Sequence, residues 1–129
     1  MIGIFLALSA ASIANCDGTQ VEMNACAEAV YRSADRKMGQ QWSRTYAAFK
    51  RNDKDMADFI SDHGPAAEAL LKAQRSWLQF REQSCEAQAR LSPGSIFPVN
   101  YFFCMAGLTE ARTEQLENFA KDPNSGDPL

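Results

Sequence analysis

Apolar side chains recur every three or four residues over the first part of the chain. They form one stripe, made of Met23, Ala27, Val30, Tyr31, Ala34, Met38, Trp42, Tyr46 and Phe49. This period is that of an α-helix with one apolar face. Thr19 and Glu22 have the spacing of a capping box at its start. The pattern predicts a helix of about 30 residues, which ends at the turn-prone residues 51–53.

A second long helix is expected after a short one. Residues 54–61 form a short amphipathic segment, and the chain then breaks at His63, Gly64 and Pro65. Proline suits the first turn of a helix, so the second long helix is predicted to start at Pro65 and to persist to about Leu91. Its inward stripe consists of Ala67, Leu70, Leu71, Gln74, Trp77, Leu78, Arg81 and Cys85.

A linker and a last helix complete the pattern. Two prolines predict that the linker over residues 92–100 is not helical. The last helix is expected over about residues 100–121, with a stripe of Phe102, Met105, Leu108, Thr109, Arg112, Leu116 and Phe119. The remaining residues, 122–129, contain two prolines and a glycine and are predicted to be frayed or disordered.

The predicted fold class is all-α. The sequence has no alternating run of β-branched residues and no hairpin dipeptide between apolar segments. We therefore expect residues 15–121 to form an antiparallel bundle of three main helices plus a short helix. In that topology the start of the first helix, the end of the second long helix and the start of the last lie at one end. All four cysteines would then gather there, as two disulfides.

Composition narrows the range of functions. The chain has 129 residues, of which 46% are hydrophobic and 22% charged, as in one folded domain. Its net charge of −3 and the absence of a basic cluster argue against a nucleic-acid partner. A mildly acidic surface favours a cationic partner instead.

The first fourteen residues indicate export. Residues 1–14 are uncharged, almost wholly apolar, and end in small side chains, which is typical of a signal peptide although no basic segment precedes them. The stretch is too short for a membrane span, so we expect a soluble mature protein that begins near Asn15 in the periplasm or outside the cell. An even number of cysteines fits that compartment. Cysteine and histidine spacing argues against a zinc site.

Candidate catalytic residues are few. His63 is the single histidine, and no partner in the sequence is placed to orient it. The acids Asp53, Asp55 and Asp58 lack the spacing of a calcium loop and are better explained as acids near a helix start. We therefore predict no enzyme activity, no catalytic residue, no metal and no cofactor.

Polar residues occupy inward positions of the predicted helices. Gln74, Arg81 and Arg112 lie on apolar stripes, and Asp35 lies beside one. A buried charge is costly unless it is paired. If Cys26 and Cys104 lie at one level, Asp35 and Arg112 should meet. A structural ion pair is the favoured interpretation, and a polar binding pocket is the alternative.

The linker carries the candidate contact surface. An apolar run in a connection either folds back onto the core or projects as a surface for a partner. The residues assigned to partner binding are Ser95, Ile96, Phe97 and Asn100.

One combination of motifs resembles a known family. It joins Ala73, Gln74, Trp77, Phe80, Arg81 and Cys85 to a later set of Cys104, Thr109 and Arg112, with Cys16, Cys26, Tyr31 and Asp35 before them. This combination covers nearly the whole mature chain and is similar to the lysozyme inhibitor LprI-like family, although Asn15 before Cys16 departs from a lipid-anchor signal.

The resemblance implies a small, exported, helical, four-cysteine protein. It also implies a protein partner, with lysozyme or a related cell-wall hydrolase as the candidate. The alternative is an envelope or secretion-system accessory or immunity protein with another partner. In either case we expect a monomer without a membrane span.

Four cysteines allow three disulfide pairings. We predict Cys16 with Cys26 and Cys85 with Cys104, because each pair is nearest in sequence and closes a loop that enters a helix. The chief rival joins Cys26 to Cys85 and Cys16 to Cys104.

Overall fold

The computed structural model describes residues 15–59 and 63–129. The predicted signal peptide, residues 1–14, lies outside the described residues, as does part of the predicted short helix. The elements, in chain order, are the 3₁₀ helix η1 (Asn15–Asp17), the α-helix α2 (Gln20–Asp55), the 3₁₀ helix η2 (Ala57–Phe59), and the α-helices α3 (Ala66–Ala89) and α4 (Phe97–Phe119). The described residues contain helices and no strand, which confirms the all-α prediction.

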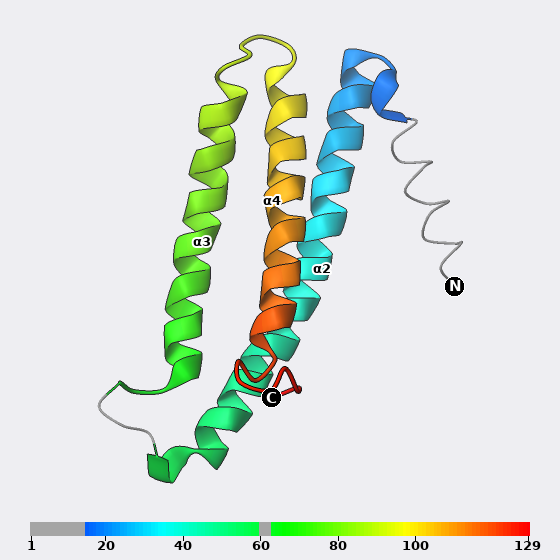
Figure 1. Cartoon of the computed structure of the whole chain (residues 1–129). Coiled ribbons are helices and arrows are strands. Elements are labelled where there is room, and N and C mark those ends of the chain that lie inside the picture. Colours follow the sequence, from blue (N-terminus) through cyan, green and yellow to red (C-terminus); the bar gives the residue numbers. More distant parts are fainter. Residues whose placement is uncertain (1–14, 60–62) are drawn as a thin grey trace.

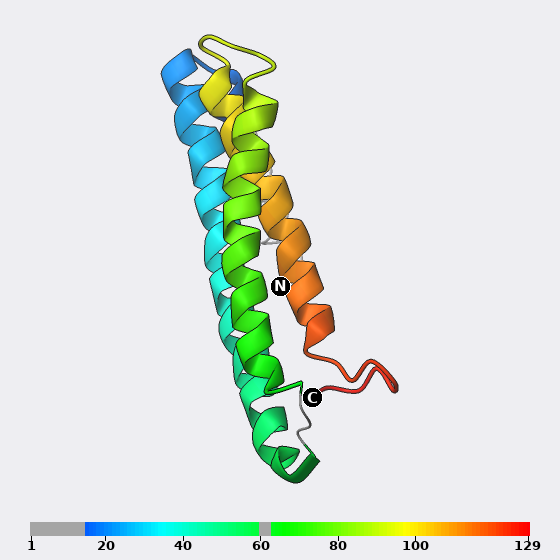
Figure 2. The ribbon, with the colours of Figure 1, turned by 90° about the vertical axis from the view of Figure 1, so that its left-hand side faces the viewer.

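The three long helices form an antiparallel bundle (Figures 1 and 2). Helix α4 packs more extensively against α2 than against α3, and α2 and α3 make the smallest contact. The start of α2, the end of α3 and the start of α4 lie at the same end, which we call the disulfide end (Figure 1). Among the described helices, none has the length and apolar character needed to cross a membrane.

Both predicted disulfides are present at this end. Cys16 is bonded to Cys26 with a Cα–Cα distance of 5.1 Å, and Cys85 is bonded to Cys104 with a distance of 5.4 Å. The rival pairing is therefore excluded. One disulfide ties η1 to α2, and the other joins α3 to α4 on either side of their connection.

Helix α2 is longer than the sequence predicted. It continues through the turn-prone residues to Asp55, and the predicted short helix is reduced to the 3₁₀ turn η2 within the described residues. Asp53 explains the difference. Its carboxylate accepts hydrogen bonds from the backbone N–H groups of Ala66 (2.9 Å) and Ala67 (2.9 Å). An acid that seemed to end one helix therefore caps the start of another, where the helix dipole favours it.

Helix α4 begins earlier than the sequence predicted. Residues 97–100 are helical, because Pro98 lies in the first turn, where its missing N–H has no intrahelical partner to lose. Gly94, with a φ of 96°, makes the preceding turn, and its carbonyl accepts a hydrogen bond from Phe97 (3.1 Å). The last helix therefore begins about three residues earlier, and the non-helical linker ends sooner, than expected.

The core is built largely from small side chains. Six of its residues are alanines: Ala27, Ala34, Ala48, Ala67, Ala89 and Ala106. Small residues allow close approach of the helices but bury little apolar area each. Leu116 and Thr45 are fully buried, and the Thr45 hydroxyl donates to the Leu116 carbonyl at 2.8 Å. This hydrogen bond joins α2 to α4 far from the disulfides.

The C-terminal residues, expected to be frayed or disordered, form a hydrogen-bonded turn instead. The N–H of Asp122 donates to the carbonyl of Asp127 at 2.7 Å, and the N–H of Leu129 donates to Ala120 at 2.9 Å. Gly126, at a φ of 78°, permits the chain reversal. The turn folds the end of the chain back onto the last turn of α4.

Candidate functional site

A partly buried ion pair, with a hydrogen bond to a third side chain, joins the three helices. Arg81 on α3 donates from Nη1 to Asp35 Oδ1 on α2 at 2.8 Å and to Thr109 Oγ1 on α4 at 2.9 Å. The Arg81 side chain is 9% exposed, whereas the Asp35 side chain is 43% exposed. The pair therefore lies at the edge of the core, with its positive partner inside.

The predicted meeting of Asp35 with Arg112 is wrong. It assumed that Cys26 and Cys104 lie at one level. In the structure Tyr31 stacks on Phe102, with ring centroids 6.0 Å apart. Tyr31 lies five residues after Cys26 and Phe102 two residues before Cys104, so α2 is displaced by roughly 10 Å along α4. The displacement brings Asp35 level with Arg81 instead.

Arg112 is buried without a carboxylate partner among the described residues. Its Nε donates to Gln74 Oε1 at 3.0 Å and its Nη1 to Gln115 Oε1, while Nη2 has no hydrogen-bond partner there. Burial lowers the pKa of the Arg112 guanidinium. Gln74 in turn approaches the Met38 sulfur at 3.9 Å. Three of the predicted polar residues, Gln74, Arg81 and Arg112, are thus buried, and the ring of Trp77, which lies beside both guanidiniums, links them into one network.

Aromatic rings provide the remaining contacts of both guanidiniums. Arg81 lies 5.2 Å from the ring centroids of Tyr31 and Trp77, and Arg112 lies 5.6 Å from Trp77 and 5.5 Å from Phe119. Rings and cations therefore alternate from Tyr31 to Phe119 in what we call the cation–π ladder. Ring faces attract cations most strongly where water is excluded, so the ladder offsets part of the burial cost.

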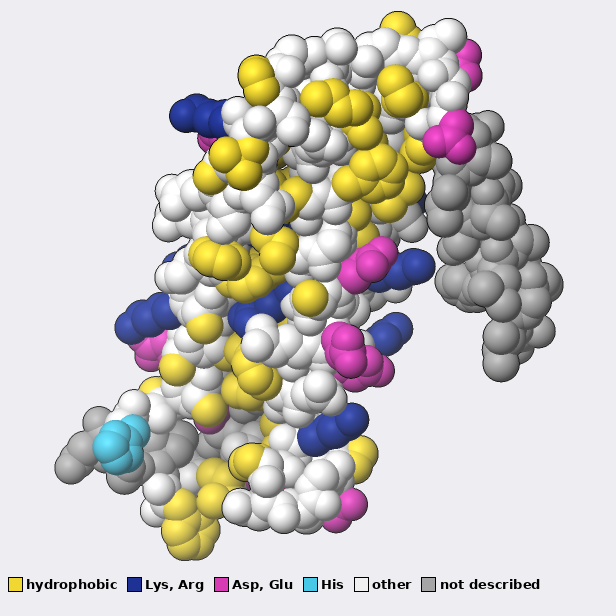
Figure 3. All heavy atoms as spheres, turned by 45° about the horizontal axis from the view of Figure 1, so that its top comes forward, with side chains coloured by type: hydrophobic (Ala, Val, Ile, Leu, Met, Phe, Trp, Pro, Cys, Tyr) yellow, Lys and Arg dark blue, Asp and Glu magenta, His cyan; other side chains and the backbone are white. Residues whose placement is uncertain are grey.

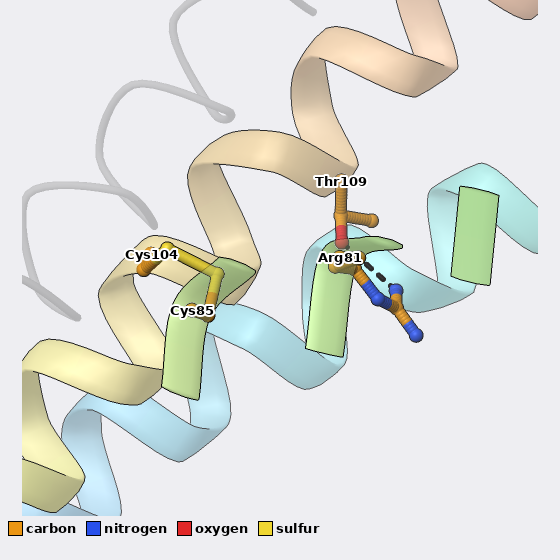
Figure 4. The surroundings of a disulfide bond; sticks show 4 residues. All are labelled: Arg81, Cys85, Cys104 and Thr109. Carbon is orange, nitrogen blue, oxygen red and sulfur yellow. Dashed lines mark hydrogen bonds between the residues drawn. A yellow bond between two sulfur atoms is a disulfide. The ribbon is translucent and has the colours of Figure 1, made fainter. Parts of the chain in front are cut away.

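The second disulfide lies directly beside this network. Figure 4 shows Arg81 and Thr109 pointing toward each other next to the bond between Cys85 and Cys104. Arg81 lies one helical turn from Cys85, and Thr109 lies five residues from Cys104. The disulfide therefore fixes the position along α3 at which the Thr109 hydroxyl of α4 meets the Arg81 guanidinium.

The network is suited to holding helices together rather than to chemistry. Its groups are two guanidiniums, amides, a hydroxyl and one carboxylate, without a nucleophile beside a base. In the described part of the chain, no group of three His, Cys, Asp or Glu side chains could hold a metal ion. His63 lies exposed in the turn before α3, away from this network. We therefore expect the functional site on the surface of the bundle.

A shallow groove opens at the disulfide end between α3 and α4. It encloses about 490 Å³ and is lined by Gln88, Ala89, Leu91, Ser92, Asn100, Phe103 and Cys104. We call it the end groove. Figure 3 shows hydrophobic side chains gathered at this end of the molecule, with acidic side chains bordering them on the side of α2.

The four residues assigned to partner binding lie around the start of α4. Ser95 is exposed and Ile96 is 38% exposed, whereas Phe97 is half-buried and stacks on Tyr101 at 6.3 Å. Asn100 lines the end groove. Phe97 therefore belongs to the first turn of α4, and the loop before it presents Ser95 and Ile96 at the surface.

Sequence reasoning missed two exposed apolar residues of this surface. Leu91 is 83% exposed and Phe103 is 40% exposed. Both are large apolar residues that lie off the inward stripe of their helices, and this departure from phase is the signal that could have identified them.

The disulfide end is strongly acidic. Residues 15–30 and 82–107 contain five carboxylates and one guanidinium, a formal charge of −4 when the whole chain carries −3. These charged residues are Asp17, Glu22, Glu28, Glu82, Glu86 and Arg90. Two of these carboxylates are ion-paired, Glu28 with Arg32 and Glu86 with Arg90. The opposite end, residues 45–70 and 108–129, is also acidic, with a formal charge of −5, so the excess of basic residues lies between the two ends.

Comparisons with known proteins give one family and one relative. The sequence model of the family described as Lysozyme inhibitor LprI matches residues 12–116. Uncharacterized protein R02472 of Rhizobium meliloti (strain 1021) is 36% identical over 100 residues, which cover 77% of this chain and 72% of that protein. No solved structure matches the chain.

Removal of the Asp35 carboxylate tests the ion pair. Asp35→Asn leaves Arg81 buried without its anion and should lower the free energy of unfolding by about 2 kcal/mol, less than a fully buried pair would lose. Glu28→Gln, which removes an exposed ion pair with Arg32 on the same helix, should cost under about 0.5 kcal/mol. Urea denaturation measures both. Equal costs would show that the Asp35 pair contributes no more than a surface pair.

Two tyrosines near the ladder should make stability depend on alkaline pH. Burial raises the pKa of Tyr31 and of Tyr101, and Glu82 adds to the shift of each while Arg81 opposes it. The folded state therefore retains these protons more strongly than the unfolded state. Their stabilising contribution is complete below pH about 10, the unfolded value, and is lost as the pH rises further.

The free energy of unfolding should accordingly fall more steeply above pH about 10 in the wild type than in Tyr31→Phe/Tyr101→Phe. Urea titrations over a series of alkaline pH values measure this difference. Parallel pH profiles for the two proteins would contradict it.

Proposed function

Since this chain belongs to the family described as Lysozyme inhibitor LprI, we propose that it is an exported protein that binds and inhibits lysozyme or a related cell-wall hydrolase. The family match spans most of the chain and both disulfides. Disulfides persist in oxidising compartments, which supports a location in the periplasm or outside the cell. Residues 1–14 are proposed to be the signal peptide that is removed on export.

The observation that carries this proposal is the family match over residues 12–116, and the acidic disulfide end supports it. A formal charge of −4 on one end attracts a cationic protein such as a lysozyme over a distance of about 8 Å, the screening length at physiological salt. Complementary charge speeds encounter and orients the partners more than it adds affinity. Inhibition would then follow from occupation of the hydrolase surface, with no covalent step.

Rigidity at the same end supports this interpretation. The Cys16–Cys26 bond holds η1 against α2, and the Cys85–Cys104 bond encloses the loop that precedes α4. A surface held in place before binding loses less conformational entropy when it meets a partner. Ser95 and Ile96 in this loop, with Phe97 and Asn100 in the first turn of α4, remain the proposed contact residues.

A cell-wall lysis assay tests the proposal. The oxidised protein, at up to about a hundredfold molar excess, should suppress the clearing of a cell-wall suspension by egg-white lysozyme. Suppression should weaken as salt is raised, because screening shortens the reach of the acidic end. Bovine serum albumin, which is also acidic, serves as the control for non-specific binding of charge. Undiminished lysis with several lysozymes at the highest excess would refute the proposal.

A further inference from the structure

We propose that the end groove between α3 and α4 is the contact site for the hydrolase and that it receives an apolar side chain from a cationic surface. This inference rests on the proposed function and names the surface that performs it. It also shifts the centre of the contact from the loop at residues 95–97 to the groove beside it.

The groove has the composition of a contact site. None of its seven lining residues carries a charge, and Leu91 and Phe103 expose large apolar side chains at its edge. Gln88, Ser92 and Asn100 supply polar groups that can hydrogen bond to a partner. An apolar centre with a polar surround is the usual arrangement of residues that dominate binding energy.

The walls of the groove are held in a fixed relation. Cys104 lines it, and the disulfide to Cys85 joins the two helices that form its sides. On α3, Phe80, Ser84 and Gln88 follow one another at intervals of one turn and therefore lie on one face. Phe80 is 56% exposed. The uncharged face therefore continues along α3 for roughly 12 Å below Gln88, which provides room for more than one partner side chain.

Charge identifies the occupant. A second copy of this chain would bring another disulfide end, with its own formal charge of −4, against the first, and like charges oppose such an approach. A cationic protein meets the same surface with complementary charge. The nearby carboxylates then steer the partner, while the uncharged groove holds it.

Paired substitutions separate these two roles. Leu91→Gln/Phe103→Gln removes the apolar edge of the groove and should weaken the Kd for egg-white lysozyme at least about tenfold. Its matched control, Met56→Gln/Phe59→Gln, changes two exposed apolar residues beside η2 at the opposite end and should leave the Kd unchanged. Isothermal titration calorimetry measures binding, and thermal unfolding confirms that each variant is folded.

The charge variants test steering. Asp17→Asn/Glu22→Gln, in η1 and α2, should lower the association rate and its salt dependence. Glu114→Gln/Glu117→Gln, which removes the same charge from the second half of α4, should not. Surface-bound lysozyme in a biosensor gives both rates.

The outcomes distinguish the groove from the function. If the wild type inhibits lysozyme and the Leu91/Phe103 variant binds equally well, the groove proposal is overturned and the proposed function stands. If the wild type fails to bind or inhibit any lysozyme, both fall. Sedimentation that shows a wild-type dimer dispersed by Leu91→Gln would overturn the proposal in favour of self-association.

Discussion

Two guanidinium groups are buried in this bundle, and only one of them, that of Arg81, is paired with a carboxylate. Arg81 has Asp35, at the edge of the core, and Arg112 has amide oxygens and aromatic faces only. Burial of two charges with so little counter-charge is costly unless the surrounding groups are held in position. The cation–π ladder, the Thr109 hydroxyl and the Gln74 amide hold the two guanidiniums in place. Because these groups lie on different helices, they meet only when the helices are in the correct register.

The register therefore connects the polar network to the surface. The Cys85–Cys104 bond aligns α3 with α4 one turn from Arg81, and the same bond lies against the end groove. A core of alanines leaves the helices close together but with little buried area to align them. The disulfides and the Arg81 contacts supply the specificity that large apolar side chains provide in other bundles.

Much of the fold could be predicted from the sequence because helical stripes, capping signals and cysteine spacing are local. The long helices and both disulfides were predicted correctly for this reason. The C-terminal end of α2 and the start of α4 were not, because Asp53 caps a helix thirteen residues away and Pro98 fits a first turn. The 122–129 turn depends on contacts with the end of α4 that no local pattern shows.

The candidate site was harder to predict than the fold. Helical phase identified Gln74, Arg81 and Arg112 as inward residues, but the partner of Asp35 depended on the roughly 10 Å displacement of α2, which sequence spacing does not contain. The groove was missed because Leu91 and Phe103 contribute to it from two helices that only the disulfide and the short loop bring together. Asn100 alone was assigned to partner binding beforehand and also lines the groove.

Hydrogen exchange of the complex with egg-white lysozyme tests the central claim most directly, because it maps the contact surface on the unaltered protein. We predict slower exchange on binding for backbone amides in residues 86–104 and no change in residues 45–59 at the opposite end. Slower exchange confined to the opposite end, with residues 86–104 unaffected, would contradict it.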